Sequence, residues 1–91
     1  MSSDAEHYAV HALTWTREKG YVKVPHPVSR RLVFLPGDLG EIFQLLDEGL
    51  DSLQVVSEMA KRYPGRSAGR VRELIDLLLQ LKVVDVVTQF D

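Results

Sequence analysis

The sequence has no cysteine, which excludes disulfide bonds, zinc–thiolate sites and thiol catalysis. It also lacks an excess of positive charge, since 11 lysines and arginines stand against 13 aspartates and glutamates, a formal net charge of −2. A general nucleic-acid binder usually carries a basic excess. No apolar run approaches the roughly 20 residues that cross a bilayer, and the opening MSSDAEHYAV does not resemble a signal peptide. We therefore expect a cytoplasmic protein that contacts neither nucleic acid nor membrane.

The motifs of catalysis are missing as well. The sequence contains neither G-x-x-x-x-G-K-S/T nor G-x-G-x-x-G, and its serines have no His–Asp constellation in view. His7 and His11 have the spacing of a helical metal pair, but the pattern around them is not helical and no further ligand is obvious. We expect no enzyme activity, no cofactor and no metal site.

Apolar residues make up 45% of the chain, an ordinary value for a globular protein. The length suits one domain, here residues 8–91 after a flexible stretch over 1–7. Strand-like segments come first: YAVHALTW (8–15), GYVKV (20–24) and RRLVFLP (30–36), with TREKG (16–20) as a turn. Two prolines, Pro25 and Pro27, break the chain before the third segment.

After residue 36 the apolar residues recur with a helical period. Asp38 and Glu41 have the spacing of a capping box, in which two side chains satisfy the first backbone N–H groups of a helix. This first helix should stop at Gly49. Asp51 and Gln54 repeat the box spacing at the start of a second helix.

The second helix should end at the Pro-Gly pair at 64–65, and Ser67 should cap a third helix that runs to about Lys82. The tail VVDVVTQF (83–90) predicts either a last strand or a packed terminus. Three strands followed by three helices indicate a small α+β domain.

The third helix, RVRELIDLLLQLK (70–82), is more apolar than a surface helix needs to be. Leu77 and Leu81 widen its core stripe on one side, and Leu79 lies toward the other; the stripe itself consists of Val71, Leu74, Ile75 and Leu78. The rest of the protein covers all of this arc in one interpretation. In the other, part of it lines a groove for another chain, next to an open sheet edge.

The third strand suits such an edge, because RRLVFL is apolar on both faces. Unpaired N–H and C=O groups there would invite another strand, unless a strand of this protein covers them. A basic cluster lies at the end of the second helix and the start of the third: Lys61, Arg62, Arg66, Arg70 and Arg72. This cluster either forms a solvated face of the protein or attracts acidic side chains of a partner peptide.

The segment LLDEGLDSLQVVSEMAKRYPGRSAGRVRELIDLLLQLKVVDV (45–86) resembles the helical half of the PqqD-like family, which includes the RiPP recognition elements (RiPPs are ribosomally made, post-translationally modified peptides). The shared pattern is an apolar helix ending in Leu-Leu-Asp-Glu-Gly, a short helix ending in Tyr-Pro-Gly, and a Leu-rich third helix with a Val-rich tail. Order and spacing carry this resemblance over nearly the whole chain.

The N-terminal half departs from the commonest family pattern, in which a Leu-Asn pair precedes the first helix, because Phe34–Gly37 stands there instead. It is more similar to the branch of the mycofactocin-system protein B, with an Arg-Arg-Leu-x-Phe-Leu third strand. Arg17 and Glu18 match that branch's Arg-x-Glu only approximately.

The resemblance implies a three-stranded antiparallel sheet followed by a three-helix bundle, close to a winged helix-turn-helix. It implies a non-catalytic peptide chaperone that binds the leader of a precursor peptide as an added strand and presents it to a modifying enzyme, often a radical S-adenosylmethionine enzyme. The peptide-binding residues implied by position are Arg31, Leu32, Val33, Phe34, Leu35, Arg70, Glu73, Leu74, Leu77, Leu78 and Leu81.

Two other functions remain open. A winged-helix DNA-binding regulator would present polar and basic residues on its recognition helix; the arginines at 66, 70 and 72 favour it, whereas the leucines and the net negative charge do not. A structural module would use the same apolar helix against a second copy of itself. For the peptide chaperone we expect a monomer or a weak dimer.

Overall fold

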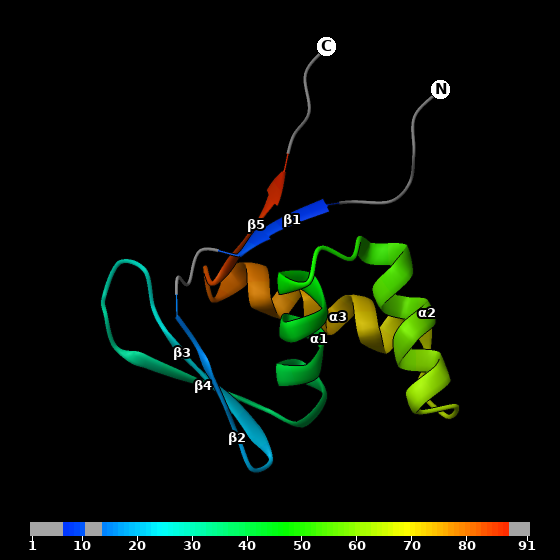
Figure 1. Ribbon diagram of the computed structural model, residues 1–91. Helices are drawn as coiled ribbons and strands as arrows, with labels where there is room; N and C mark the ends of the chain where they lie inside the picture. Colours follow the sequence, from blue (N-terminus) through cyan, green and yellow to red (C-terminus); the bar gives the residue numbers. More distant parts are fainter. Residues whose placement is uncertain (1–6, 11–13, 88–91) are drawn as a thin grey trace.

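Three strands and then three helices follow one another through the middle of the chain (Figure 1). The computed structural model describes residues 7–10 and 14–87. Strands β2, β3 and β4 form an antiparallel sheet in that order, and β1 pairs with β5. The predicted α+β class is therefore confirmed. The elements are β1 (His7–Val10), β2 (Thr16–Glu18), β3 (Tyr21–Pro25), β4 (Leu32–Pro36), α1 (Gly37–Asp47), α2 (Ser52–Arg62), α3 (Ala68–Gln80) and β5 (Val84–Val87).

The prediction of one strand over 8–15 is wrong. Its beginning forms β1, which pairs with β5 rather than with the three-stranded sheet, while residues 11–13 lie outside the described residues. The turn predicted at 16–20 is also too long, because Thr16–Glu18 pairs with β3 and only Lys19 and Gly20 make the turn. Gly20 has φ +87°, as a two-residue hairpin turn requires. Of the two alternatives for the tail, Val84–Val87 forms a strand.

Local side-chain signals set several helix ends as predicted. Asp51 and Gln54 form a complete capping box at the start of α2, and the Ser67 hydroxyl accepts a hydrogen bond from the backbone N–H of Arg70. After α1, Gly49 takes φ +98° and its N–H donates to the carbonyl of Leu46, which closes the helix.

Helix α1 lies at the centre of the molecule, in contact with strands β1, β3 and β4 and with both other helices (Figure 1). A Cβ atom at Gly40 would lie only 2.6 Å from the carbonyl oxygen of Leu35 and 3.0 Å from Val22 Cγ2. The helix therefore packs against the sheet closely enough to require a glycine. The fully buried side chains of this helix and its neighbours include Val22, Val24, Leu35, Ile42, Phe43, Leu45, Leu46, Val55, Met59, Leu78 and Val83.

Gly40→Ala is expected to lower the free energy of unfolding by about 1–3 kcal/mol, because the new methyl group meets backbone that cannot move aside. Gly69→Ala in α3 is the matched control, since a Cβ there meets nothing within 4 Å. Helix propensity alone favours alanine at both positions, by up to about 1 kcal/mol. Urea unfolding of the two variants checks the prediction, and equal stability of both would contradict the close approach of α1 to β4.

Candidate functional site

Strand β4 forms one edge of the three-stranded sheet. The sheet order is β2-β3-β4, so β4 pairs with β3 on one side and with no strand among the described residues on the other. The prediction that RRLVFL lies at a sheet edge therefore holds for the described part of the chain. An edge of this kind presents backbone donors and acceptors that an incoming extended chain can use.

The hydrogen bonds at the two ends of the β3–β4 ladder show which groups of β4 point outward. The backbone N–H of Gly37 donates to Gly20, and that of His26 donates to the carbonyl of Arg31. In an antiparallel ladder hydrogen-bonded pairs alternate with non-bonded pairs. Counting from these two bonds in the register of β4, residues 33 and 35 pair with β3, whereas the N–H and C=O groups of Leu32 and Phe34 point away from the sheet.

The hairpin before β4 is held by its own side chains. The Nδ1 atom of His26 accepts hydrogen bonds of 3.1 Å from the backbone N–H groups of Val28 and Ser29. Arg30 takes the left-handed conformation, with φ 64°, and its N–H donates to the carbonyl of His26. These contacts fix the direction in which β4 leaves the turn.

Side chains alternate across β4. Val33 and Leu35 point toward the core, whereas Leu32 and Phe34 are 52% and 56% exposed on the outer face of the sheet. Phe34 is supported there by an edge-to-face contact with Tyr21, with ring centroids 5.6 Å apart. Exposed apolar side chains beside an open edge are typical of a surface that binds another chain.

Three of the residues predicted from the resemblance are not on the surface. Leu35, Leu74 and Leu78 are buried in the core, because they belong to the inner face of β4 and to the central stripe of α3. This corrects the predicted surface: their side chains cannot contact a peptide. The predicted residues with solvent-exposed or half-buried side chains are Arg31, Leu32, Val33, Phe34, Arg70, Glu73, Leu77 and Leu81.

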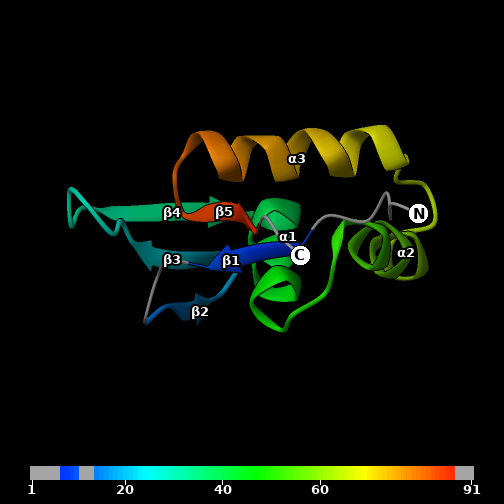
Figure 2. The same ribbon diagram turned by 90° about the horizontal axis from the view of Figure 1, so that it is seen from above.

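Helix α3 runs in the opposite direction to β4, with its C-terminal part nearest to the end of that strand and its start beyond α1 (Figure 2). Near its start, the charge of Arg70 contributes to lowering the pKa of Asp38 in the first turn of α1. Near its end, Lys82 and Val28 of the hairpin line the same hollow of about 350 Å³. Leu77 and Leu81 lie on the same flank of α3 as Arg70 by the helical period. Leu77 is 38% exposed and Leu81 is half-buried.

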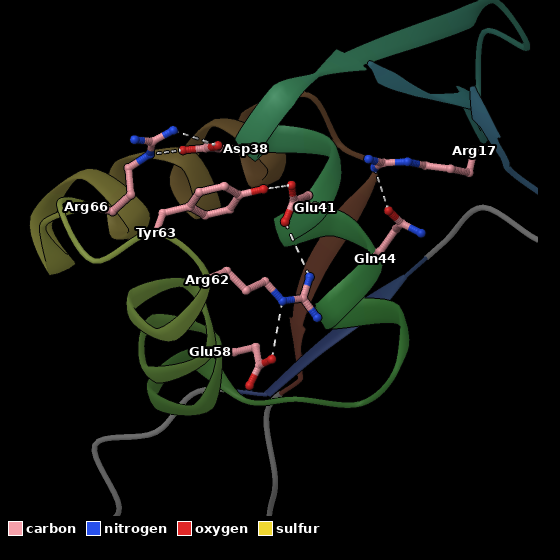
Figure 3. A network of polar contacts seen from close by, with 8 residues as sticks. All are labelled: Arg17, Asp38, Glu41, Gln44, Glu58, Arg62, Tyr63 and Arg66. Atoms are coloured by element: carbon pink, nitrogen blue, oxygen red, sulfur yellow. Dashed lines mark hydrogen bonds and ion pairs between the residues drawn. The ribbon is translucent and has the colours of Figure 1, made fainter. Parts of the chain in front are cut away.

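A network of polar side chains fastens the start of α3 and the end of α2 to α1 (Figure 3). The Tyr63 hydroxyl donates to Glu41, and Arg62 bonds both Glu41 and Glu58 at 3.3 Å. The hydrogen bond with Glu41 is the main reason why the pKa of Tyr63 lies above its ordinary value. Arg66 pairs with Asp38, and its guanidinium lies 5.0 Å from the centre of the Tyr63 ring.

The prediction of a capping box at the start of α1 is wrong, because both of its carboxylates belong to this polar network. Pro36 occupies the N-cap position and makes no side-chain cap, while Asp38 and Glu41 bind residues 21 to 28 positions away. Their spacing suits a cap, but long-range ion pairs compete for both carboxylates. The helix start is thereby tied to the α2–α3 turn.

Protonation of Asp38 is expected to weaken this attachment. The hydrogen bond from Arg66, helped by the charges of Arg66 and Arg70 and opposed by burial, holds the pKa of Asp38 below its ordinary value. Because this pKa is lower in the folded chain, the stabilisation is present above about pH 4 and is lost as pH falls through the folded value. Asp38→Asn should therefore be less stable than the parent at pH 7, with a gap that narrows in acid. Urea unfolding of both proteins at pH 7 and in acid measures this difference. A difference in the free energy of unfolding that does not change with pH would contradict the prediction.

The basic cluster predicted around α2 and α3 is divided by the structure. Lys61, Arg62 and Arg66 are in ion pairs with Glu58, Glu41 and Asp38. Within the described part of the chain, Arg70 and Arg72 form no ion pair within 4.0 Å. These two arginines are the ones left available for a partner.

Neither a metal-ligating cluster nor a membrane-spanning helix is found among the described residues. Across residues 7–10 and 14–87, no group of three or more His, Cys, Asp or Glu side chains could hold a metal ion. No helix in the same ranges is long and apolar enough to cross a membrane. The features that stand out are the open edge of β4 and the flank of α3 beside it.

Sequence reasoning missed Tyr21 as a part of this surface. Tyr21 supports Phe34 from the neighbouring strand, a contact that depends on register rather than on sequence spacing. Lys82 takes φ 66° just after α3 and lines a hollow with Val28, Leu79 and Asp85, none of which belongs to β4.

No family model, curated protein or solved structure matches the chain.

Proposed function

We propose that this protein is a non-catalytic peptide chaperone of the cytoplasm. It binds the leader of a ribosomally made precursor peptide as an added strand on β4 and presents the rest of the precursor to a separate modifying enzyme, such as a radical S-adenosylmethionine enzyme. The open edge of β4, with the outward N–H and C=O groups of Leu32 and Phe34, is the observation that carries this proposal. The resemblance to the PqqD-like family supports it.

The physical basis is the division of work between backbone and side chains. Leu32 and Phe34 together supply two donors and two acceptors, which bind any extended chain regardless of its sequence. Selectivity has to come from side chains next to this edge. Phe34 and Leu32 supply it on the outer face of the sheet, and Leu77 and Leu81 on the flank of α3.

The DNA-binding alternative is less well supported by the surface of α3. Its exposed residues include two acids, Glu73 and Asp76, beside Arg70 and Arg72, as well as the apolar Leu77. A recognition helix that inserts into the major groove gains from a basic and polar surface. This mixed surface suits a peptide better than a phosphate backbone.

The test is a ¹H–¹⁵N NMR titration with candidate leader peptides. We expect shifts concentrated in residues 30–35 and 70–81, with Leu53 on α2 as an internal control because it is 45% exposed and lies outside the proposed surface. Absence of shifts across a suitable panel would overturn the proposal. Shifts of Arg70 and Arg72 with duplex DNA would instead favour the regulator, and a mass that rises with concentration would favour self-association.

A further inference from the structure

The exposed apolar side chains of β4 lie on its outer face, away from the helices. Leu32 and Phe34 are exposed there, two positions apart along the strand. The inner face offers less, because Leu35 is fully buried and Val33 packs against the core. A strand added to this edge therefore meets the exposed apolar surface of β4 mainly on the outer face.

The backbone of the same two residues sets where the side chains of an added strand lie. The N–H and C=O groups of Leu32 and Phe34 point away from β3, so these are the groups that an incoming strand pairs with. Residues that lie opposite each other in a ladder point to the same face of the sheet, close enough to contact. Two side chains of the bound strand, two positions apart, must therefore lie beside Leu32 and Phe34. This spacing holds for either direction of the bound strand, because side chains alternate in both.

The surroundings of these two residues favour particular neighbours. The ring of Phe34 meets Tyr21 edge-to-face, with centroids 5.6 Å apart, and most of its other side is open to solvent. A ring from the bound strand would extend this aromatic row and bury more of Phe34. Beside Leu32 the outer face continues into an apolar hollow of about 190 Å³ that Trp15 and Pro25 also line. An aromatic side chain suits the first position, and an apolar side chain suits the second.

One cation belongs to the same face. Lys23 lies directly opposite Phe34 in the register of β3 and β4, and it lines the hollow beside Leu32. Among the described residues Lys23 forms no ion pair within 4.0 Å. An added strand would lie two strand spacings, about 10 Å, from β3, which is within the range of this charge at low salt. A basic side chain at either outward position of the bound strand is therefore unfavourable.

We propose that the bound peptide carries an aromatic and an apolar residue two positions apart, both facing outward, with no basic residue at either position. This inference rests on the proposed function, since it requires a peptide strand on β4. The aromatic side chain packs on Phe34, and the apolar one lies beside Leu32. Backbone bonds hold any extended chain, whereas this pair selects the chain and sets its register.

The experiment uses fluorescein-labelled peptides and the full chain in fluorescence anisotropy titrations. The paired probe is Gly-Thr-Thr-Phe-Thr-Phe-Thr-Thr-Gly. The split probe, Gly-Thr-Thr-Phe-Phe-Thr-Thr-Thr-Gly, has the same composition, but its rings fall on opposite faces of a strand. We expect the paired probe to bind about threefold to tenfold more tightly. Equal affinity of the two probes, or tighter binding of the split probe, would overturn the inference.

Two variants test the role of the aromatic row. Phe34→Leu keeps an apolar side chain but removes the ring, so it should reduce the advantage of the paired probe. Leu53→Ala on α2 is the matched control, because Leu53 is also exposed but lies outside the proposed surface. It should leave the advantage unchanged. An advantage of the same size in Phe34→Leu would contradict packing of the peptide ring on Phe34.

The charge of Lys23 gives a second, independent readout. A paired probe with Glu in place of its second Phe should bind about twofold more tightly at low salt than one with Lys there. Lys23→Gln should reduce this difference, and an undiminished difference would place the side chain elsewhere.

NMR spectra separate the failure of this inference from the failure of the proposed function. Equal affinity for the paired and split probes, with shifts of the Leu32 and Phe34 amides, would overturn the aromatic–apolar pair and leave strand addition in place. No shift of these amides with any probe would overturn both.

Discussion

Phe43→Ala is expected to lower the free energy of unfolding by about 3–5 kcal/mol. Phe43 is fully buried in α1, the helix that contacts both sheets and both other helices. Its ring also meets Trp15 edge-to-face, with centroids 5.9 Å apart. A chain of 91 residues buries a modest core, so this loss is a large part of its stability. Urea unfolding followed by circular dichroism measures it.

Phe34→Ala is the matched control, because the same side chain is removed from a position that is 56% exposed. Only the contact with Tyr21 and part of the outer face are lost, at a cost of about 1 kcal/mol. The two variants should therefore separate stability from binding: Phe43→Ala affects folding, whereas Phe34→Ala affects the peptide surface. Equal destabilisation by both would contradict the assignment of Phe34 to the outer face.

Leu32→Pro is expected to weaken binding of a leader peptide by at least about tenfold, while the protein stays folded. The backbone N–H of Leu32 points away from β3, so proline there removes no hydrogen bond of the sheet. It removes a donor from the open edge and places a ring where an added strand would lie. Isothermal titration calorimetry measures the affinity, and thermal unfolding shows that the fold is kept.

Leu32→Ala distinguishes backbone from side-chain effects at the same position. It shortens a side chain that is 52% exposed but keeps the N–H group. We expect it to bind more tightly than Leu32→Pro. If the two variants bind equally well, the backbone of β4 is not the peptide-binding element, and strand addition is excluded at this edge.

The parts of the fold that depend on neighbours in sequence could be predicted from the sequence. Asp51 caps α2 and Ser67 caps α3 through bonds to residues three positions away. The central stripe of α3 also follows from its period, and Val71, Leu74, Ile75 and Leu78 are indeed buried. Short-range hydrogen bonds and helical periodicity leave direct marks in the sequence.

The parts that depend on distant partners could not be predicted. The pairing of β1 with β5 joins the two ends of the chain, and nothing in the N-terminal segment identifies that partner. Asp38 and Glu41 have the spacing of a cap but serve Arg66, Arg62 and Tyr63 instead. A local motif predicts a local bond only when no distant group competes for it.

The candidate site shows the same division. The wide apolar arc of α3 was visible in the sequence, and Leu77 on its flank is exposed as one of the two interpretations requires. The choice of Leu74 and Leu78 as contacts was wrong, because periodicity places residues on a stripe without showing where the stripe ends. Lys82 takes a left-handed backbone conformation that its sequence position does not reveal.

Amide hydrogen exchange along β4, with and without a leader peptide, tests strand addition most directly. In the free protein the amides of Val33 and Leu35 should exchange slowly because they pair with β3, whereas those of Leu32 and Phe34 should exchange fast. A bound strand should slow Leu32 and Phe34 and leave Val33 and Leu35 little changed. If saturating peptide leaves Leu32 and Phe34 exchanging at their free rates, the peptide does not bind as a strand on β4.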